Sequence, residues 1–217
     1  MKRKRKIMVL ALAILGGVIL RSSPVEATLV TIEIEAVVDS VDDPFGYLEG
    51  NITPGDIITG IYTYDTDTPD SSPLPGAGRY EHYAHPSGFS LSVGGLDFVT
   101  DPANTDFLIE IVNNYPYDDG YGVVSYNNLP LSNGTSVNNT SWGLKDYSAT
   151  AISSIELTAT APVLDDWDVN RLAVNGGTRA RPFGIMSHVT SAVVIPEPAT
   201  VLLLSFGGLI FVRRGKK

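Results

Sequence analysis

The stretch Phe89-Ser-Leu-Ser-Val-Gly-Gly-Leu-Asp-Phe-Val99 decides the fold class of this chain. Apolar and polar side chains alternate on both sides of Gly94-Gly95, and a period of two places alternate side chains on opposite faces of a strand. A two-residue Gly-Gly connection suits a primed hairpin turn, because both of its residues need a positive φ. The stretch therefore predicts an antiparallel β-hairpin with one buried face and one wet face.

The same alternation extends outward from this hairpin in both directions. It is clearest in residues 31–38 and 58–64, and further strands are expected at 107–112, 122–127, 154–160 and 183–194. A helical period of 3.6 is not evident, apart from one short turn expected within Asp165–Leu172. The pattern predicts an all-β domain built as an antiparallel two-sheet sandwich, jelly-roll-like or immunoglobulin-like, rather than a barrel.

The N-terminus has the three parts of a secretory signal peptide. Residues 1–6 are Met followed by five basic residues, residues 7–20 are apolar, and Val25-Glu26-Ala27 offers small residues for cleavage. We expect signal peptidase to cut after Ala27, so that residues 1–27 are an export signal forming a short helix. An uncleaved N-terminal anchor is the alternative, because Arg21 interrupts the approach to the cleavage site.

The C-terminus is a second tripartite segment. Pro196-Glu197-Pro198 precedes an apolar run, Ala199–Val212, and a basic cluster follows it at Arg213, Arg214, Lys216 and Lys217. The prolines prevent a helix from entering from upstream, and the run of 14 residues is shorter than the roughly 20 that span a bilayer comfortably. The basic cluster favours a cytoplasmic end. We expect a short transmembrane helix; an ordinary C-terminal anchor is one interpretation of it.

This tail resembles the PEP-CTERM sorting signal of exported proteins in Gram-negative, often exopolysaccharide-making, bacteria. The resemblance implies recognition and cleavage by a membrane-embedded exosortase, with residues 28–194 as the exported domain and 195–217 as the sorting signal. It also implies an inner-membrane precursor whose mature form reaches the cell envelope, the cell surface or the extracellular matrix. The segment Gly55–Pro73 with Gly78–Tyr80 resembles a strand-and-loop pattern of uncharacterised proteins with the same tail. The signal is also named after ice-binding proteins, but a regular Thr-x-Thr array is missing here.

Charge and cysteine content narrow the function classes. Residues 28–195 contain five Lys and Arg against 22 Asp and Glu, a formal net charge of −17. Such a surface disfavours nucleic acid as a partner, because binding it requires Lys and Arg to neutralise phosphates. The chain has no cysteine, which excludes disulfides, a thiol nucleophile and a cysteine-based zinc site.

An acidic run is the candidate metal site. Asp65, Asp67 and Asp70 follow a predicted strand, and a loop there could place several oxygens around calcium. The alternative is a solvated turn in which the carboxylates bind their own backbone. Asp118-Asp119 and the group Asp165, Asp166 and Asp168 are weaker candidates. No other cofactor is expected.

Aromatic residues offer a candidate sugar platform. Tyr115, Tyr117 and Tyr121 lie near Asn and Asp residues, and Trp142 and Trp167 are the two tryptophans; a plain connecting loop is the alternative. His82 and His85 stand three apart, so on a strand they point to opposite sides and do not chelate one ion. Motifs of nucleophilic or phosphate chemistry are missing, and an acid pair such as Asp165 and Asp168 is the only hint of a glycosidase.

These features predict an exported, non-catalytic protein of the envelope or the extracellular matrix, with exopolysaccharide as a candidate partner. A carbohydrate- or calcium-binding module of that matrix is the alternative, and a hydrolase is the third hypothesis.

Overall fold

The structure is a computed structural model that describes residues 29–196. Its strands form one antiparallel sheet in the order β3-β6-β7-β8-β9-β10-β1-β2-β4-β5. The bounds are β1 Leu29–Asp42, β2 Ile57–Asp65, β3 Ala77–His82, β4 Gly88–Val93, β5 Leu96–Val99, β6 Phe107–Val112, β7 Asp119–Ser125, β8 Val137–Asp146, β9 Val169–Thr178 and β10 Arg181–Ile195, with a 3-10 turn, η1, at Leu164–Asp166. The chain is therefore all-β across its described part, as the alternating pattern predicts.

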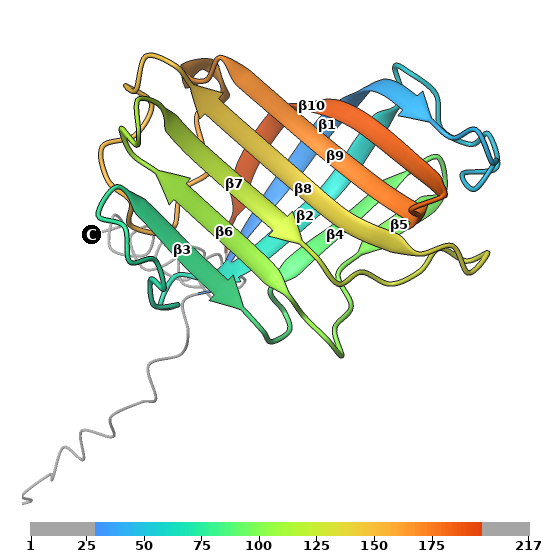
Figure 1. Ribbon diagram of the computed structural model, residues 1–217, viewed down its shortest axis with the longest axis horizontal. Helices are drawn as coiled ribbons and strands as arrows, with labels where there is room; N and C mark the ends of the chain where they lie inside the picture. Colours follow the sequence, from blue (N-terminus) through green and yellow to red (C-terminus); the bar gives the residue numbers. More distant parts are fainter. Residues whose placement is uncertain (1–28, 197–217) are drawn as a thin grey trace, which may run out of the picture.

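The sheet curls so that its two halves face each other across one core. Figure 1 shows β6, β7 and β8 lying across β1, β2 and β4. Tyr62 of β2 packs against Trp142 of β8 with ring centroids 5.9 Å apart, and Phe89 of β4 packs against Phe107 of β6 at 5.6 Å. Burial of such side chains stabilises the fold by roughly 1.5–3 kcal/mol each.

The predicted division into two sheets is not confirmed. Hydrogen bonds run without interruption through all ten strands, and the long strands β1 and β10 join the two halves. Their register shifts at Glu35/Ala36 and at Val38/Ser40. Such bulges increase the local twist and bend of a strand, so a single sheet can curl until its two halves face each other.

The predicted hairpin is confirmed as β4 and β5. Val93 pairs with Leu96, and the connecting Gly94 and Gly95 have φ of 58° and 77°, as a primed turn requires. A Cβ on Gly94 would lie 2.3 Å from the backbone oxygen of Asn51. This position therefore needs glycine both for its backbone conformation and for close packing.

The sequence pattern fails to predict three of the strands, and it predicts one strand that the structure does not contain among the described residues. β3, β8 and β9 are strands that the pattern does not predict, and the short turn expected within 165–172 is confined to η1, after which β9 begins at Val169. Residues 154–160 are irregular rather than a strand. Polar and apolar residues alternate there as in a strand, but the carbonyls of Ile155 and Thr158 accept hydrogen bonds from tyrosine hydroxyls instead of from a neighbouring strand.

Both ends of the domain emerge at the same place. Thr31, near the start of β1, pairs with Ile195 at the end of β10. The predicted signal helix and the predicted C-terminal hydrophobic helix lie outside the described residues. Within residues 29–196, no helix has the length and apolar character needed to cross a membrane.

Candidate functional site

A strap, residues 151–163, forms the later part of the connection from β8 to η1 and is held against the sheet by three side chains. Asp119 Oδ2 accepts a hydrogen bond from the Ile152 N–H at 3.0 Å. The hydroxyl of Tyr80 donates to the Ile155 carbonyl at 2.7 Å, and the hydroxyl of Tyr64 donates to the Thr158 carbonyl at 2.6 Å. All three anchors are buried, so the course of the strap is defined by the core beneath it.

Two buried carboxylates support the start of the strap. Asp119 and Asp146 are direct partners in the β7–β8 register, where like charges would repel. Each is instead surrounded by donors. Asp146 accepts the backbone N–H groups of Ser148, Thr150 and Ala151 at 2.7, 2.7 and 3.0 Å, and Asp119 also accepts the Asn114 N–H at 2.8 Å.

The donors around Asp146 change its acidity. The hydroxyl of Ser148, followed by the Thr150 N–H, holds the pKa of Asp146 well below its ordinary value, because these bonds favour the charged form.

Asp119 is occupied by backbone N–H groups, and its neighbour Asp118 forms an ion pair with Lys145 at 2.6 Å. The predicted cation site at Asp118-Asp119 therefore has other partners for both residues.

A groove of about 290 Å³ lies between the strap and the sheet. The sheet contributes Ile111 and Tyr121, and the end of η1 contributes Asp166 and Trp167. The strap supplies the remaining wall, which includes Glu156 and the hydroxyl residues Ser153, Ser154, Thr158 and Thr160. The groove thus combines an apolar floor, one indole ring, two carboxylates and several hydroxyls.

The predicted aromatic platform is divided between the core and the surface. Trp142 is fully buried, and its ring lies 5.9 Å from that of Tyr121. Tyr121 is largely buried as well, with its hydroxyl 3.0 Å from that of Tyr62. Tyr115 and Tyr117 are exposed and are not part of the groove wall. Of the two tryptophans, Trp167 is the one that lines the groove.

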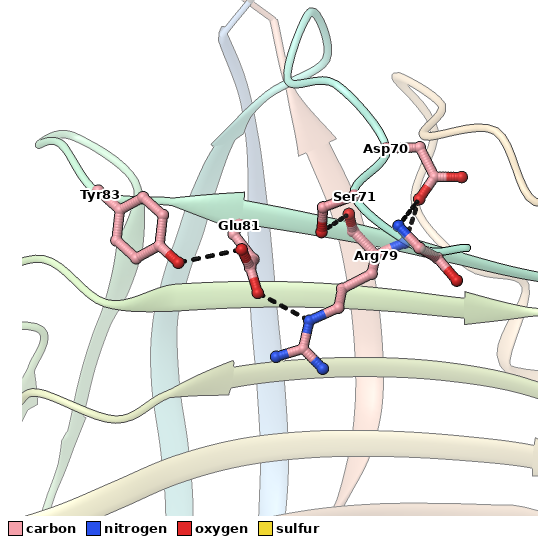
Figure 2. A network of polar contacts seen from close by, with 6 residues as sticks. Asp70, Ser71, Arg79, Glu81 and Tyr83 are labelled. Carbon is pink, nitrogen blue, oxygen red and sulfur yellow. Dashed lines mark hydrogen bonds and ion pairs between the residues drawn. The ribbon is translucent and has the colours of Figure 1, made fainter. Parts of the chain in front are cut away.

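The acidic run binds its own backbone and the edge of the sheet. Asp65 Oδ1 accepts the Asp67 N–H at 2.9 Å. Asp70 Oδ1 accepts the N–H groups of Ser72 and Arg79, both at 2.8 Å, and the Ser71 N–H donates to the Arg79 carbonyl at 2.8 Å. Figure 2 shows Asp70 and Ser71 on either side of Arg79 in the edge strand β3.

This arrangement is the one that the turn interpretation requires. Among residues 29–196, no three His, Asp or Glu side chains are grouped as a metal site would need. Calcium binding by Asp65, Asp67 and Asp70 stays a prediction, but the structure shows that the carboxylates of Asp65 and Asp70 accept backbone hydrogen bonds.

The remaining sequence candidates are exposed or already hydrogen-bonded. His82 is buried, with Nε2 3.2 Å from the Asp65 carbonyl, and burial lowers its pKa. His85 is exposed beyond the end of β3. Asp165 is exposed, whereas Asp168 accepts the Tyr147 N–H at 2.8 Å.

The strap and its groove are the features that sequence reasoning missed. Their anchors lie far away in the chain: Tyr64 binds a residue 94 positions later. The one available signal was Trp167 among acidic residues, since a polar loop that carries a tryptophan is unusual for a solvated connection.

Comparisons of the chain with protein-family models, with curated proteins and with solved structures found no match.

Proposed function

We propose that the chain is the precursor of an exported, non-catalytic protein of the cell envelope or extracellular matrix, sorted through its C-terminal tail. Signal peptidase would cut after Ala27, and an exosortase would act on Pro196-Glu197-Pro198. Matrix exopolysaccharide is the proposed surrounding of the mature protein. A β domain of net charge −17 suits such a place, because acidity keeps an exported protein soluble.

One observation carries this proposal: the two ends of the domain lie together. Thr31 and Ile195 are partners across β1 and β10, so residues 1–27 and residues 196–217 join the domain at the same place. Both predicted membrane segments have their basic residues at the chain terminus, which favours a cytoplasmic position for both termini. A domain whose ends lie close to each other can be attached to one membrane by both segments from the same side, and this supports the proposal.

Replacing Pro196, Glu197 and Pro198 with alanine tests the proposal. Export should continue, because the N-terminal signal is intact, but final processing should stop, and the uncut form should accumulate in the inner membrane. Intact mass and cell fractionation measure both effects. A control replaces the exposed loop residues Pro73 and Pro75 with alanine and should be processed normally. Unchanged mass and location in the triplet variant would refute the sorting proposal.

A carbohydrate-binding module within the matrix is the second candidate, and the groove beside Trp167 favours it. The calcium module and the hydrolase remain alternatives without comparable support. For the architecture, the facing halves of the curled sheet support a sandwich, and a jelly-roll-like or immunoglobulin-like topology stays a proposal.

A further inference from the structure

We infer that the groove beneath the strap is a binding site for a neutral glycan, with Trp167 as the stacking surface and Glu156 and Asp166 as hydrogen-bond acceptors. The inference rests on the proposed function, since a matrix protein meets polysaccharide at high concentration. It adds a defined site and a ligand class to that function.

The lining of the groove matches the two kinds of surface on a sugar ring. Ile111, Tyr121 and Trp167 supply apolar and aromatic area, which suits the C–H face of a pyranose. Glu156, Asp166 and the hydroxyls of the strap surround that area with polar groups. A few polar groups placed around an apolar floor are typical of small-molecule sites.

The charge of the groove selects against acidic ligands. Its wall contains Glu156 and Asp166 but no Lys, Arg or His. A uronate, sulfate or phosphate group would meet two carboxylates without a compensating cation. Sugar hydroxyls, in contrast, are donors, and hydrogen bonds from a hydroxyl to a carboxylate are stronger than those between neutral groups.

The size and rigidity of the groove also fit a short glycan segment. Its volume of about 290 Å³ is just below the range of roughly 300–1,000 Å³ for small-molecule sites. The bonds from Asp119, Tyr80 and Tyr64 hold the strap in place before any ligand arrives. A preformed site loses less conformational entropy on binding than a mobile loop.

Binding to oligosaccharides tests the inference directly. The full-length chain, purified in detergent, would be titrated with neutral oligosaccharides of glucose, galactose and mannose, and with an oligouronate of equal length. We expect at least one neutral oligosaccharide to bind, with a change in tryptophan fluorescence, and the oligouronate to bind at least tenfold more weakly. Binding should persist in high salt, because it does not depend on long-range charge attraction.

Two adjacent acids provide a matched pair of variants. Both are exposed, but Asp166 lines the groove and Asp165 does not. Asp166→Asn should raise the dissociation constant roughly tenfold, as expected for loss of a charged hydrogen bond, and Asp165→Asn should leave it unchanged. Trp167→Ala should abolish the fluorescence change, and Glu156→Gln should weaken binding without a risk to the core.

The inference fails if none of the neutral oligosaccharides binds, if the oligouronate binds as tightly, or if Asp165→Asn and Asp166→Asn behave alike. These measurements use the purified chain and do not depend on processing of the tail. Failure of glycan binding therefore leaves the sorting proposal intact, and failure of sorting in the triplet variant leaves the glycan site intact.

Discussion

Asp146 shows how one side chain organises a connection. Its carboxylate accepts three backbone N–H groups and the hydroxyls of Ser148 and Thr150, so it replaces the strand partners that the chain loses after β8. Five donors on one carboxylate favour its charged form. Asp146 is therefore a structural anchor at the start of the strap.

Asp146→Asn should lower the melting temperature of the domain at neutral pH, because an amide accepts these bonds less strongly than a carboxylate. The pKa of Asp146 is depressed in the folded state. Its stabilisation is thus complete above its unfolded pKa of about 3.9 and is lost as the pH falls through the folded value.

The difference between the native protein and Asp146→Asn should consequently shrink as the pH falls below about 4. Thermal unfolding at pH 7 and at pH 3 measures this change. Asp165→Asn is the control, since Asp165 is exposed, and a native-like melting temperature is expected for it. Equal stability of native protein and Asp146→Asn at pH 7 would contradict the anchoring role.

At the scale of elements, the loop after β2 protects an edge of the sheet. β3 is the first strand in the sheet order, and an unprotected edge strand tends to pair with another molecule. Asp70 and Ser71 bind the N–H and the carbonyl of Arg79. Glu81 also accepts hydrogen bonds from Arg79 Nε at 2.8 Å and from the hydroxyl of Tyr83, just beyond the end of β3, at 3.0 Å, as Figure 2 shows.

Asp70→Ala should increase self-association, because it frees the N–H of Arg79 and removes one of the bonds that attach the loop to β3. Size-exclusion chromatography with light scattering would detect dimers or larger species. Asp67→Ala is the matched control: Asp67 is exposed and lies in the same acidic run, so the variant should elute as the native protein does. Identical elution of the two variants would count against the edge-protecting role.

The same variants separate edge protection from calcium binding. A calcium ion shared by Asp65, Asp67 and Asp70 would stabilise the native state by about 2.7 kcal/mol at a calcium concentration roughly a hundred times Kd. The melting temperature would then rise with calcium, and Asp67→Ala would erase that rise. A melting curve that does not respond to calcium or chelator leaves the turn interpretation.

At the scale of the whole molecule, one aromatic cluster joins the two halves of the sheet. Trp142 of β8 contacts Tyr62 of β2 and Tyr121 of β7, each with centroids 5.9 Å apart. Trp142 is fully buried, so it packs in the centre of the only core formed by residues 29–196. Loss of this ring should weaken both halves together.

Trp142→Ala should destabilise the protein by about 3–5 kcal/mol, as large-to-small changes of buried aromatic residues do. Circular dichroism and tyrosine fluorescence should report one coincident denaturant transition, at a lower midpoint than in the native protein. Trp167→Ala is the comparison, because Trp167 is only partly buried and should cost much less. Two separate transitions would show that the halves unfold independently.

Local pattern predicts part of this fold and misses the rest for identifiable reasons. The hairpin at Gly94-Gly95 is predicted because its strands are neighbours and its turn requires positive φ. β8 is missed because Val137-Asn-Asn-Thr-Ser is polar, and it becomes a strand through pairing with β7 and β9 on both sides. Polar and apolar residues alternate in 154–160 as in a strand, yet this segment lies against the core, where tyrosine hydroxyls donate hydrogen bonds to two of its carbonyls.

The sequence could indicate some residues of the candidate site but not their arrangement in space. Trp167 and the acids near it stand out in the sequence, but nothing in it places Asp166 and Trp167 beside Ile111 and Tyr121. The predicted tyrosine platform fails for the same reason. Alternation on β7 turns Tyr121 inward, whereas Tyr117 lies in the preceding loop and stays exposed.

The sequence by itself determined the β class and the hairpin, because periodicity and turn chemistry are local properties. The targeting signals at the two ends stay predictions from the sequence. Only the tertiary structure decided that the strands form one curled sheet, that the strap covers a groove, and that Thr31 meets Ile195. Pairing of β1 with β10 connects opposite ends of the domain, and no local pattern records such a partner. The free energy that selects it comes from burial of a shared core.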